Sequence, residues 1–274
     1  MTARSDQALA GALRDLALAV GTAAADHAVS ERRLGLACST KSSRTDLVTN
    51  VDRSTEALIV SLLLDARPGD GILGEEGGER SATSGVRWII DPIDGTTNFV
   101  YDLAGWAVSI GAELGGEVVA GAVICPSLAS TFAAARDLGA TCNGVPLHVG
   151  VESPPLAQAL IGTGFSYLAD TRRRQAERLV TVLPEVRDIR RAGAAAMDLC
   201  SVASGRLDAY FEEGLGPWDL AAGGLIAVEA GAHASSLDGG AIRPESVLVC
   251  HPGLAAAMIE LIARADSPAS DPLD

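Results

Sequence analysis

The sequence predicts an α/β (α+β) fold in which helices cover an antiparallel sheet in the first half and alternate with strands in the second. Ahead of Pro68 the apolar residues recur at helical spacing. After it they form short runs bounded by Gly, Pro and Asn, a pattern typical of strands. From about Pro154 onward such runs alternate with helical patterns, which indicates crossover helices between strands. We therefore expect two structural halves, residues 1–150 and 151–274.

The first half begins with helices and continues as strands. An apolar stripe at helical spacing predicts a helix from about Ser5 to His27. Thr49 followed by Asp52 resembles a capping box that starts a second helix, and Pro68-Gly69 ends it. The apolar runs that follow predict strands of an antiparallel sheet, with a Gly-Gly turn joining two of them: Ile72-Leu73, Val86–Ile90, Ala107–Leu114, Glu117–Ile124 and Ser130–Ala135.

The second half alternates between the two patterns. Gly205 closes one of its helices and Pro217 opens another, which are the residue types favoured at those positions. The predicted strands are Ala159–Gly162, a short one near Ile189, Leu207–Phe211 and Val247–Cys250. The predicted helices are Thr171–Leu183, Gly193–Ser204, Pro217–Ala230 and Pro252–Ala265, followed by a tail that we expect to be frayed.

Composition limits the function classes. The chain has 274 residues, 48% of them hydrophobic, and its formal net charge is −14. So apolar a chain is not disordered, and so negative a surface disfavours nucleic acid and anionic membranes as partners. The one dense basic run, Arg172–Arg174, is interpreted as a solvated helix face. We expect no nucleic-acid partner and no membrane partner.

Cysteine usage and the N-terminus indicate a cytoplasmic protein. Five cysteines lie scattered along the chain, and none of them is spaced as CxxC. They are therefore interpreted as reduced thiols rather than as disulfides or zinc ligands. The N-terminus lacks the basic and apolar regions of a signal peptide. Charges such as Arg14-Asp15 interrupt the apolar stretches, so we expect no membrane span.

The most informative stretch runs from Trp88 to Phe99. A buried strand ends at Asp91, and Asp94 follows three residues later on the same side of a turn fixed by Pro92. The next residues, Gly95-Thr96-Thr97, can open a helix whose free N–H groups point outward. Two carboxylates beside a helix N-terminus can hold a divalent cation and a phosphate together. The alternative is a strand, an Asx-type turn and an N-cap with no ligand.

Two other acidic positions strengthen the metal hypothesis. Glu75-Glu76 lies between glycines directly after a predicted strand, and Asp219 lies in the first turn of an apolar helix. Taken alone, the first pair fits an exposed acidic loop, and Asp219 fits a carboxylate favoured by the helix dipole. Carboxylates from three remote segments, all at the ends of predicted elements, favour one shared site.

These motifs resemble the signatures of the inositol monophosphatase family. The matching runs are Gly74-Glu75-Glu76, Asp91–Phe99 and Trp218–Gly223. Further matches upstream and downstream are Asp46-Leu47-Val48-Thr49 with Asp52, and Gly193–Ala196 leading to Gly205–Tyr210. The resemblance covers about Leu9 to Ala265, and it implies a layered α/β/α/β/α sandwich that usually assembles as a homodimer. It also implies that residues 1–150 carry the main metal-binding motifs and that residues 151–274 complete the active site.

The resemblance assigns roles to individual residues. A first Mg²⁺ would be held by Glu75, Asp91 and the backbone carbonyl of Ile93, and a second by Asp91, Asp94 and Asp219. The family uses two or three such ions, and Mn²⁺ is a possible substitute. Carboxylate and carbonyl ligands without Cys or His favour Mg²⁺ or Mn²⁺ over Zn²⁺.

The remaining roles concern water, phosphate and the polyol. Thr96, with Glu75, would orient the attacking water, and the backbone N–H groups of Gly95 and Thr96 would receive phosphate oxygens. Lys41 and Asp52 match outer positions that assist the metal site. The residues that would face the substrate hydroxyls are Asp94, Ala195 and Glu212, and Asp219 would also belong to the substrate-binding set.

The implied activity is lithium-sensitive hydrolysis of inositol 1-phosphate by in-line attack of a metal-activated water. Three alternative substrates use the same machinery: histidinol phosphate, fructose 1,6-bisphosphate and 3′-phosphoadenosine nucleotides. Glu212 and the run Thr97-Asn98-Phe99 favour inositol, since a neutral polyol ring needs a carboxylate acceptor rather than cations. A further alternative is a regulatory binding protein that retains the fold. Gly216-Pro217 stands where some relatives carry a bulkier polar pair near the substrate. The resemblance therefore does not predict which residues form the rim of the substrate site here.

Overall fold

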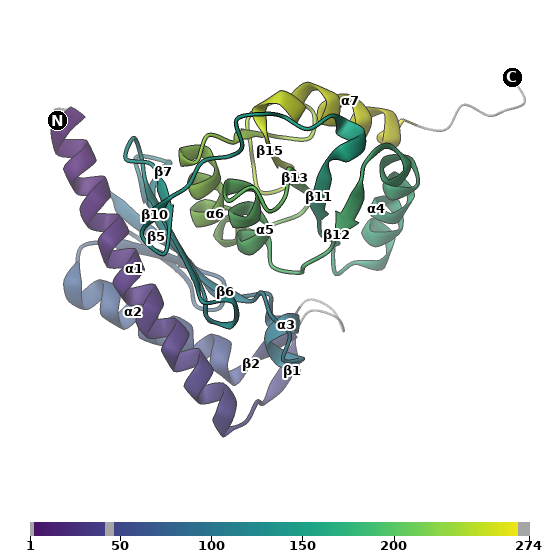
Figure 1. Cartoon of the computed structure of the whole chain (residues 1–274). Coiled ribbons are helices and arrows are strands. Elements are labelled where there is room, and N and C mark those ends of the chain that lie inside the picture. Colours follow the sequence, from purple (N-terminus) through teal and green to yellow (C-terminus); the bar gives the residue numbers. More distant parts are fainter. Residues whose placement is uncertain (1–2, 42–46, 268–274) are drawn as a thin grey trace, which may run out of the picture.

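The computed structural model describes residues 3–41 and 47–267. Asp46 and the tail 268–274, which we expected to be frayed, lie outside these described residues. Figure 1 shows the described chain as stacked layers, with helices on the outside and between two sheets. This arrangement confirms the α/β class and the layered sandwich that the sequence resemblance implies.

The larger sheet has eight strands in the order β10-β9-β8-β7-β6-β5-β3-β4. Its neighbours pair antiparallel except for β3 and β5, so the expectation of a purely antiparallel sheet is wrong at this pair. The chain turns from β3 into the edge strand β4 and then crosses back to β5, which therefore runs parallel to β3. The strands are β3 (Gly71–Gly74), β4 (Gly78–Arg80), β5 (Val86–Asp94), β6 (Ala107–Leu114), β7 (Glu117–Cys125), β8 (Ser130–Ala135), β9 (Ala140–Cys142) and β10 (Val145–Pro146).

The parallel pair decides where the site forms. Because β3 and β5 run in the same direction, the residues that follow them meet at one edge of the sheet. Glu75, the first residue after β3, donates its backbone N–H to the carbonyl oxygen of Ile90 at 3.2 Å. The strand predicted to end at Ile90 continues to Asp94, with a register shift between Asp91 and Asp94. Such a shift is a β-bulge, which redirects side chains at the end of a strand.

Helices α1 (Ala3–Leu34) and α2 (Asn50–Ala66) cover one face of this sheet (Figure 1). Their buried side chains and those of the sheet form one apolar core. The capping box at the start of α2 is confirmed, with Thr49 as the cap and Asp52 as its acidic partner. Helix α1 extends beyond the predicted end at His27 because its last turn is held by the loop after β5. Arg32 donates to the carbonyl of Phe99 at 2.8 Å and pairs with Asp102 at 2.7 Å.

Helix α1 also bears on the expectation that nothing spans a membrane. Among the described residues, its segment Ser5–Leu34 is long and apolar enough to cross a bilayer by length and composition. A core helix passes the same test, and the inward face of α1 packs against β6, β7 and β8. The buried residues of this face are Ala10, Leu13, Ala17, Val20, Ala24 and Ala28.

The smaller sheet has five strands in the order β12-β11-β13-β15-β14, with parallel pairs on both sides of β11 and antiparallel pairs around β15. Its strands are β11 (Leu160–Thr163), β12 (Asp188–Arg190), β13 (Ala209–Glu212), β14 (His233–Ser235) and β15 (Val247–Cys250). Helices α5 (Ala195–Ala203) and α6 (Pro217–Glu229) fill the space between the two sheets, and α4 (Ala169–Val182) and α7 (Ala255–Asp266) cover the outer face.

Several short elements escaped the sequence analysis. A two-stranded sheet joins β1 (Cys38–Thr40) to β2 (Leu47–Thr49). By contrast, the helix start expected at Gly95-Thr96-Thr97 is confirmed as the one-turn helix α3 (Thr96–Val100), which follows β5. Strands β4, β9, β10 and β14 were not predicted, since elements of two or three residues carry no periodicity. The predicted strand Ser130–Ala135 and the predicted start of α6 at Pro217 agree with the structure.

Two glycines set the distance between the large sheet and α6. A Cβ atom added at Gly111 of β6 would lie 2.8 Å from Cβ of Ala221. One added at Gly121 of β7 would lie 2.9 Å from Cα of Ala222. The helix backbone therefore approaches the sheet more closely than any side chain on these strands would allow. This contact also fixes Asp219, which lies in the first turn of α6.

We expect Gly121→Ala to destabilise the protein by about 1–3 kcal/mol, because the added methyl group meets backbone atoms of α6. Thermal unfolding followed by circular dichroism measures the effect. Gly224→Ala is the matched control in the same helix, where the methyl group meets only the side chain of Leu220 and gains about 0.5–1 kcal/mol of helix stability. Equal melting temperatures for the two variants would contradict the close contact.

Candidate metal centre

One pocket collects the predicted metal and substrate residues. It has a volume of about 330 Å³ and opens at the edge where β3 and β5 end, against the N-termini of α5 and α6. Of the residues proposed from the sequence, all except Lys41 and Asp52 line it: Glu75, Asp91, Ile93, Asp94, Gly95, Thr96, Ala195, Glu212 and Asp219.

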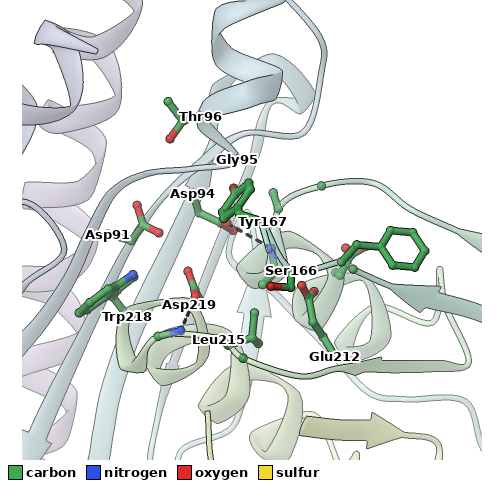
Figure 2. A pocket seen from close by; sticks show the side chains of 18 of the residues that line it. Asp91, Asp94, Gly95, Thr96, Ser166, Tyr167, Glu212, Leu215, Trp218 and Asp219 are labelled. Carbon is green, nitrogen blue, oxygen red and sulfur yellow. Dashed lines mark hydrogen bonds between the residues drawn. The ribbon is translucent and has the colours of Figure 1, made fainter. Parts of the chain in front are cut away.

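Three carboxylates form the centre of the pocket. Figure 2 shows Asp91, Asp94 and Asp219 turned toward one another. One carboxylate oxygen from each lies within 4.8 Å of the other two. The bulge at the end of β5 brings Asp91 and Asp94 to the same side, and Asp91 Oδ1 accepts the backbone N–H of Ile93 at 2.9 Å. The sequence predicted four grouped carboxylates; the fourth, Glu75, lines the same pocket and interacts with Asp91, although it is not one of the three that lie within 4.8 Å of one another.

Backbone N–H groups at two helix starts hold two of these carboxylates. Asp94 accepts the N–H of Ala195 at 3.2 Å and that of Ala196 at 2.8 Å, both from the first turn of α5. Asp219 accepts the N–H of Gly216 at 2.6 Å and so caps its own helix α6. Helix N-termini stabilise anions, which explains how these two buried carboxylates can be ordered in the fold.

The three carboxylates nevertheless carry strongly perturbed acidities. Burial raises the pKa of Asp91 well above its ordinary value, and the charges of Glu75, Asp94 and Asp219 raise it further. Burial likewise raises the pKa of Asp94, with Asp219 as the largest neighbouring charge. Burial, together with the charges of Glu75 and Glu212, raises the pKa of Asp219 to about 7. Mutual repulsion and desolvation thus favour protonation or a bound cation at this position.

Glu75 is held by a cation from a different segment. Lys41 Nζ donates to Glu75 Oε1 at 2.8 Å and also pairs with Glu76. Burial lowers the pKa of Lys41, but the carboxylates of Glu75 and Glu76 outweigh this effect and raise the pKa above its ordinary value. Burial raises the pKa of Glu75, although the Lys41 charge acts in the opposite direction. Lys41 therefore lies beside the pocket as the counter-ion of the Glu75-Glu76 pair.

Glu56 of α2 is a supporting residue that the sequence analysis missed. Its carboxylate is buried and accepts the N–H of Glu76 at 2.9 Å. It also accepts the N–H of Gly77, and Cβ atoms at Gly74 or Gly77 would lie 2.4–2.6 Å from its carboxyl group. Glu56 thus anchors the loop that carries Glu75. The sequence does show a glutamate on the apolar side of a predicted helix. Its role cannot be predicted until the structure shows that the Glu75 loop packs against it.

Thr96 links the pocket to Asp52. Gly95 precedes it with φ +83°, and a Cβ at Gly95 would lie 3.0 Å from Cβ of Ala194, so only glycine fits this turn. The Thr96 hydroxyl lies 3.1 Å from Asp52 Oδ1 and 3.2 Å from the carbonyl oxygen of Ile93. A hydroxyl has one proton and donates to one of these acceptors at a time. Asp52 is fully buried, and burial raises its pKa.

The opposite end of the pocket is also acidic. Glu212 lies apart from the three central carboxylates (Figure 2) and accepts a hydrogen bond from the buried hydroxyl of Tyr210. Burial raises the pKa of Glu212, and the charge of Arg191 acts in the opposite direction. Asp198 of α5 lines this end as well, and the sequence analysis did not single it out.

The donor set fits a hard divalent cation. Asp91, Asp94 and Asp219 offer carboxylate oxygens within one coordination sphere's reach, and no His or Cys belongs to this group among the described residues. Mg²⁺ and Mn²⁺ prefer such oxygen ligands, whereas Zn²⁺ sites normally include nitrogen or sulfur.

Comparison with known proteins gives consistent results. The sequence model described as the inositol monophosphatase family matches residues 6–267. Inositol-1-monophosphatase of Mycobacterium bovis is 53% identical over 202 residues, which cover 70% of this chain and 69% of that protein. Nus factor SuhB of Salmonella typhimurium is 40% identical over 200 residues, covering 71% and 73%. The solved structure of Mycobacterium tuberculosis SuhB matches with a TM-score of 0.79 and 40% identity, covering 93% of this chain and 97% of that one.

The carboxylate group predicts how metal-free protein responds to pH. The pKa of Asp219 rises to about 7 in the folded protein, from an unfolded value of about 3.9. Between these values the folded state binds more protons, so the free energy of unfolding falls as the pH rises. We expect a lower melting temperature in EDTA at pH 7.5 than at pH 5, and a larger gain from Mg²⁺ at pH 7.5. Scanning calorimetry measures both, and Asp219→Asn should flatten the dependence; an unchanged slope in that variant contradicts the assignment.

We expect Glu56→Gln to weaken Mg²⁺ binding, because the amide replaces one acceptor and leaves a buried N–H of the Glu75 loop unpaired, at a cost of about 1–3 kcal/mol. Isothermal titration of the metal-free protein with Mg²⁺ measures the affinity. Glu79→Gln, at an exposed residue of β4, is the control and should leave it unchanged. A lower melting temperature with normal Mg²⁺ affinity would limit Glu56 to a structural role.

Proposed function

The chain belongs to the inositol monophosphatase family, and from that premise we propose that it is a Mg²⁺-dependent phosphomonoesterase that hydrolyses inositol 1-phosphate to myo-inositol and phosphate. The observation that carries the proposal is the group of Asp91, Asp94 and Asp219 in one buried pocket. The name of the 53% identical relative, inositol-1-monophosphatase, supports the choice of substrate.

The proposed metal ligands come from three segments. Glu75, Asp91 and the carbonyl of Ile93 would hold one ion, and Asp91, Asp94 and Asp219 would hold another, with Asp91 shared. When bound, Mg²⁺ supplies positive charge for the phosphate oxygens and lowers the pKa of a coordinated water. The same charge offsets the repulsion that raises the pKa values of these carboxylates.

The remaining residues orient water and phosphate. Asp52 Oδ1 is positioned to accept the proton of the Thr96 hydroxyl, which leaves the lone pairs of Thr96 Oγ1 free to accept a hydrogen bond from the attacking water. Glu75 would act with Thr96 on the same water. Gly95 and Thr96 line the pocket at the start of α3, and their backbone N–H groups would receive phosphate oxygens.

The acidic end of the pocket supports a polyol as the leaving group. Glu212 lines the side of the pocket away from Asp91 (Figure 2), and Ala195, in the first turn of α5, lines the same pocket. A carboxylate accepts hydrogen bonds from hydroxyl groups and repels a second phosphate. This favours inositol 1-phosphate over fructose 1,6-bisphosphate and 3′-phosphoadenosine nucleotides, and histidinol phosphate remains the closest competitor because its amine suits a carboxylate.

We propose that the protein forms a homodimer, because members of this family usually assemble as homodimers. Support comes from apolar side chains exposed on neighbouring segments at the end of α1 and after α3, which are joined by the Arg32–Asp102 ion pair. Leu34, Tyr101 and Leu103 are 81%, 69% and 55% exposed. Exposed apolar residues grouped on a surface often mark an interface.

We expect Mg²⁺-dependent release of phosphate from inositol 1-phosphate, and loss of at least about a thousandfold in kcat for Asp91→Asn, since this change removes a shared anionic ligand. A phosphate-release assay with and without EDTA measures both. Histidinol phosphate, fructose 1,6-bisphosphate and 3′-phosphoadenosine 5′-phosphate serve as competing substrates in the same assay. Absence of metal-dependent turnover on all four would refute the phosphatase assignment.

A regulatory role is the second candidate, favoured by the 40% identical relative named Nus factor SuhB. The two roles are compatible, since one uses the pocket and the other a surface. The Asp91→Asn variant separates them, because a surface role would survive in a protein that no longer releases phosphate. The measurement is affinity purification of each variant from cell extract. Partners that stay bound to Asp91→Asn but are lost from the double variant Asp91→Asn, Leu34→Glu would assign the regulatory role to the surface around Leu34.

A further inference from the structure

Asp198 is a buried acid that the proposed mechanism leaves without a task. It lies on α5, one turn after Ala195, and its side chain lines the pocket although the residue is only 3% exposed. Among residues 3–41 and 47–267, no hydrogen bond or ion pair to its carboxyl group is formed. Burial and the charges of Glu212 and Arg191 are what act on this carboxyl group. A carboxyl group that lines a pocket and has no partner in the described protein is available to hydrogen-bond a ligand there.

Strand β11 and the glycine that follows it lie against this acid and Glu212. A Cβ added at Gly162 would lie 3.5 Å from Asp198 Oδ1 and 2.8 Å from the side chain of Leu207. A Cβ added at Gly164 would lie 1.9–2.2 Å from the carboxyl atoms of Glu212. Gly162 of β11 and Gly164 just after the strand therefore lie beside the two acids, and a side chain at Gly164 would displace Glu212.

We propose that Asp198 is a substrate-binding residue that pairs with Glu212 to recognise neighbouring hydroxyl groups of a neutral polyol. This inference rests on the proposed phosphatase function and adds a specificity determinant at the end of the pocket remote from Asp91. The two acids are fixed by different means, since Tyr210 donates to Glu212 while Asp198 has its carboxyl group free for the ligand.

The chemistry of Asp198 suits a hydroxyl partner. Burial, together with the charge of Glu212, raises the pKa of Asp198 to about 8, while Arg191 acts in the opposite direction. A protonated carboxyl group offers one donor and one acceptor, which matches the donor and acceptor of a hydroxyl group. A second phosphate at this position would meet two acids, and the neighbouring positive charge in the described chain is the exposed Arg191.

The test compares two substrates that share the phosphate ester and differ in the leaving group. Inositol 1-phosphate carries hydroxyl groups, and p-nitrophenyl phosphate carries none. We expect Asp198→Ala to raise KM for inositol 1-phosphate by about tenfold or more, the loss typical of a buried hydrogen bond to an acid. The variant should leave kcat for both substrates, and KM for p-nitrophenyl phosphate, within about twofold. Asp198→Asn keeps a donor and an acceptor in the same shape and should restore KM to within about threefold of the original.

Stability and product inhibition separate binding from a structural role. The inhibition constant of myo-inositol should rise in Asp198→Ala while that of inorganic phosphate stays the same. The melting temperature of the metal-free variant should be equal or higher, because an unpartnered buried acid is removed. Asp65→Asn, at an exposed residue of α2, is the control for loss of one carboxylate and should change neither quantity.

The outcomes distinguish this inference from the proposed function. Equal effects of Asp198→Ala on both substrates, no effect on either, or a lower melting temperature with unchanged KM each overturn the assignment of Asp198 and leave the phosphatase standing. Absence of Mg²⁺-dependent turnover in the unmodified protein overturns the proposed function itself. Turnover of p-nitrophenyl phosphate without turnover of inositol 1-phosphate overturns both the polyol substrate and the role of Asp198.

Discussion

Repulsion among buried carboxylates is the constraint on which the rest of this structure depends. Asp91, Asp94 and Asp219 place oxygens within 4.8 Å of one another where little water screens them. The free-energy cost of bringing these charges together is met by several elements, each of which supplies and orients part of the group. The bulge of β5 supplies two acids, and the start of α6 supplies the third. Backbone N–H groups fix the orientation of Asp94 and Asp219 without neutralising them, and the pKa values remain raised.

The layered architecture serves this constraint in two ways. The parallel pairing of β3 with β5 brings Glu75 to the edge where Asp91 lies, which a purely antiparallel sheet would not do. The glycines at Gly111 and Gly121 let α6 lie directly on the same sheet, so the helix that carries Asp219 is fixed by backbone contact. An error of an ångström in either contact would separate the carboxylates and remove the cation site.

The sequence predicted most of the large elements and the identity of the acids, for physical reasons that differ between the two. Long segments such as α2 and the β6–β7 hairpin can be predicted from the spacing of their apolar residues and from their turn residues. The acids were found through motifs at element ends. Glu56 and Asp198 were missed because each is a single polar residue within an apolar helix, and its meaning depends on which strand the helix faces. The end of β5 was misplaced because Pro92 indicates a turn, whereas a bulge accommodates it inside the strand.

The pocket contains two groups of acids that are ordered by different means, and this difference bears on selectivity. Asp94 and Asp219 accept backbone N–H groups, which orient carboxylates toward a cation. Asp198 and Glu212 instead lie beside Gly162 of β11 and Gly164 just after it, and Glu212 accepts a hydrogen bond from Tyr210. Within the described part of the chain, only the first group brings three carboxylate oxygens within 4.8 Å of one another, so a divalent cation should bind there. A substrate with its phosphate at one end and hydroxyl groups at the other matches this division, whereas a substrate with anions at both ends does not.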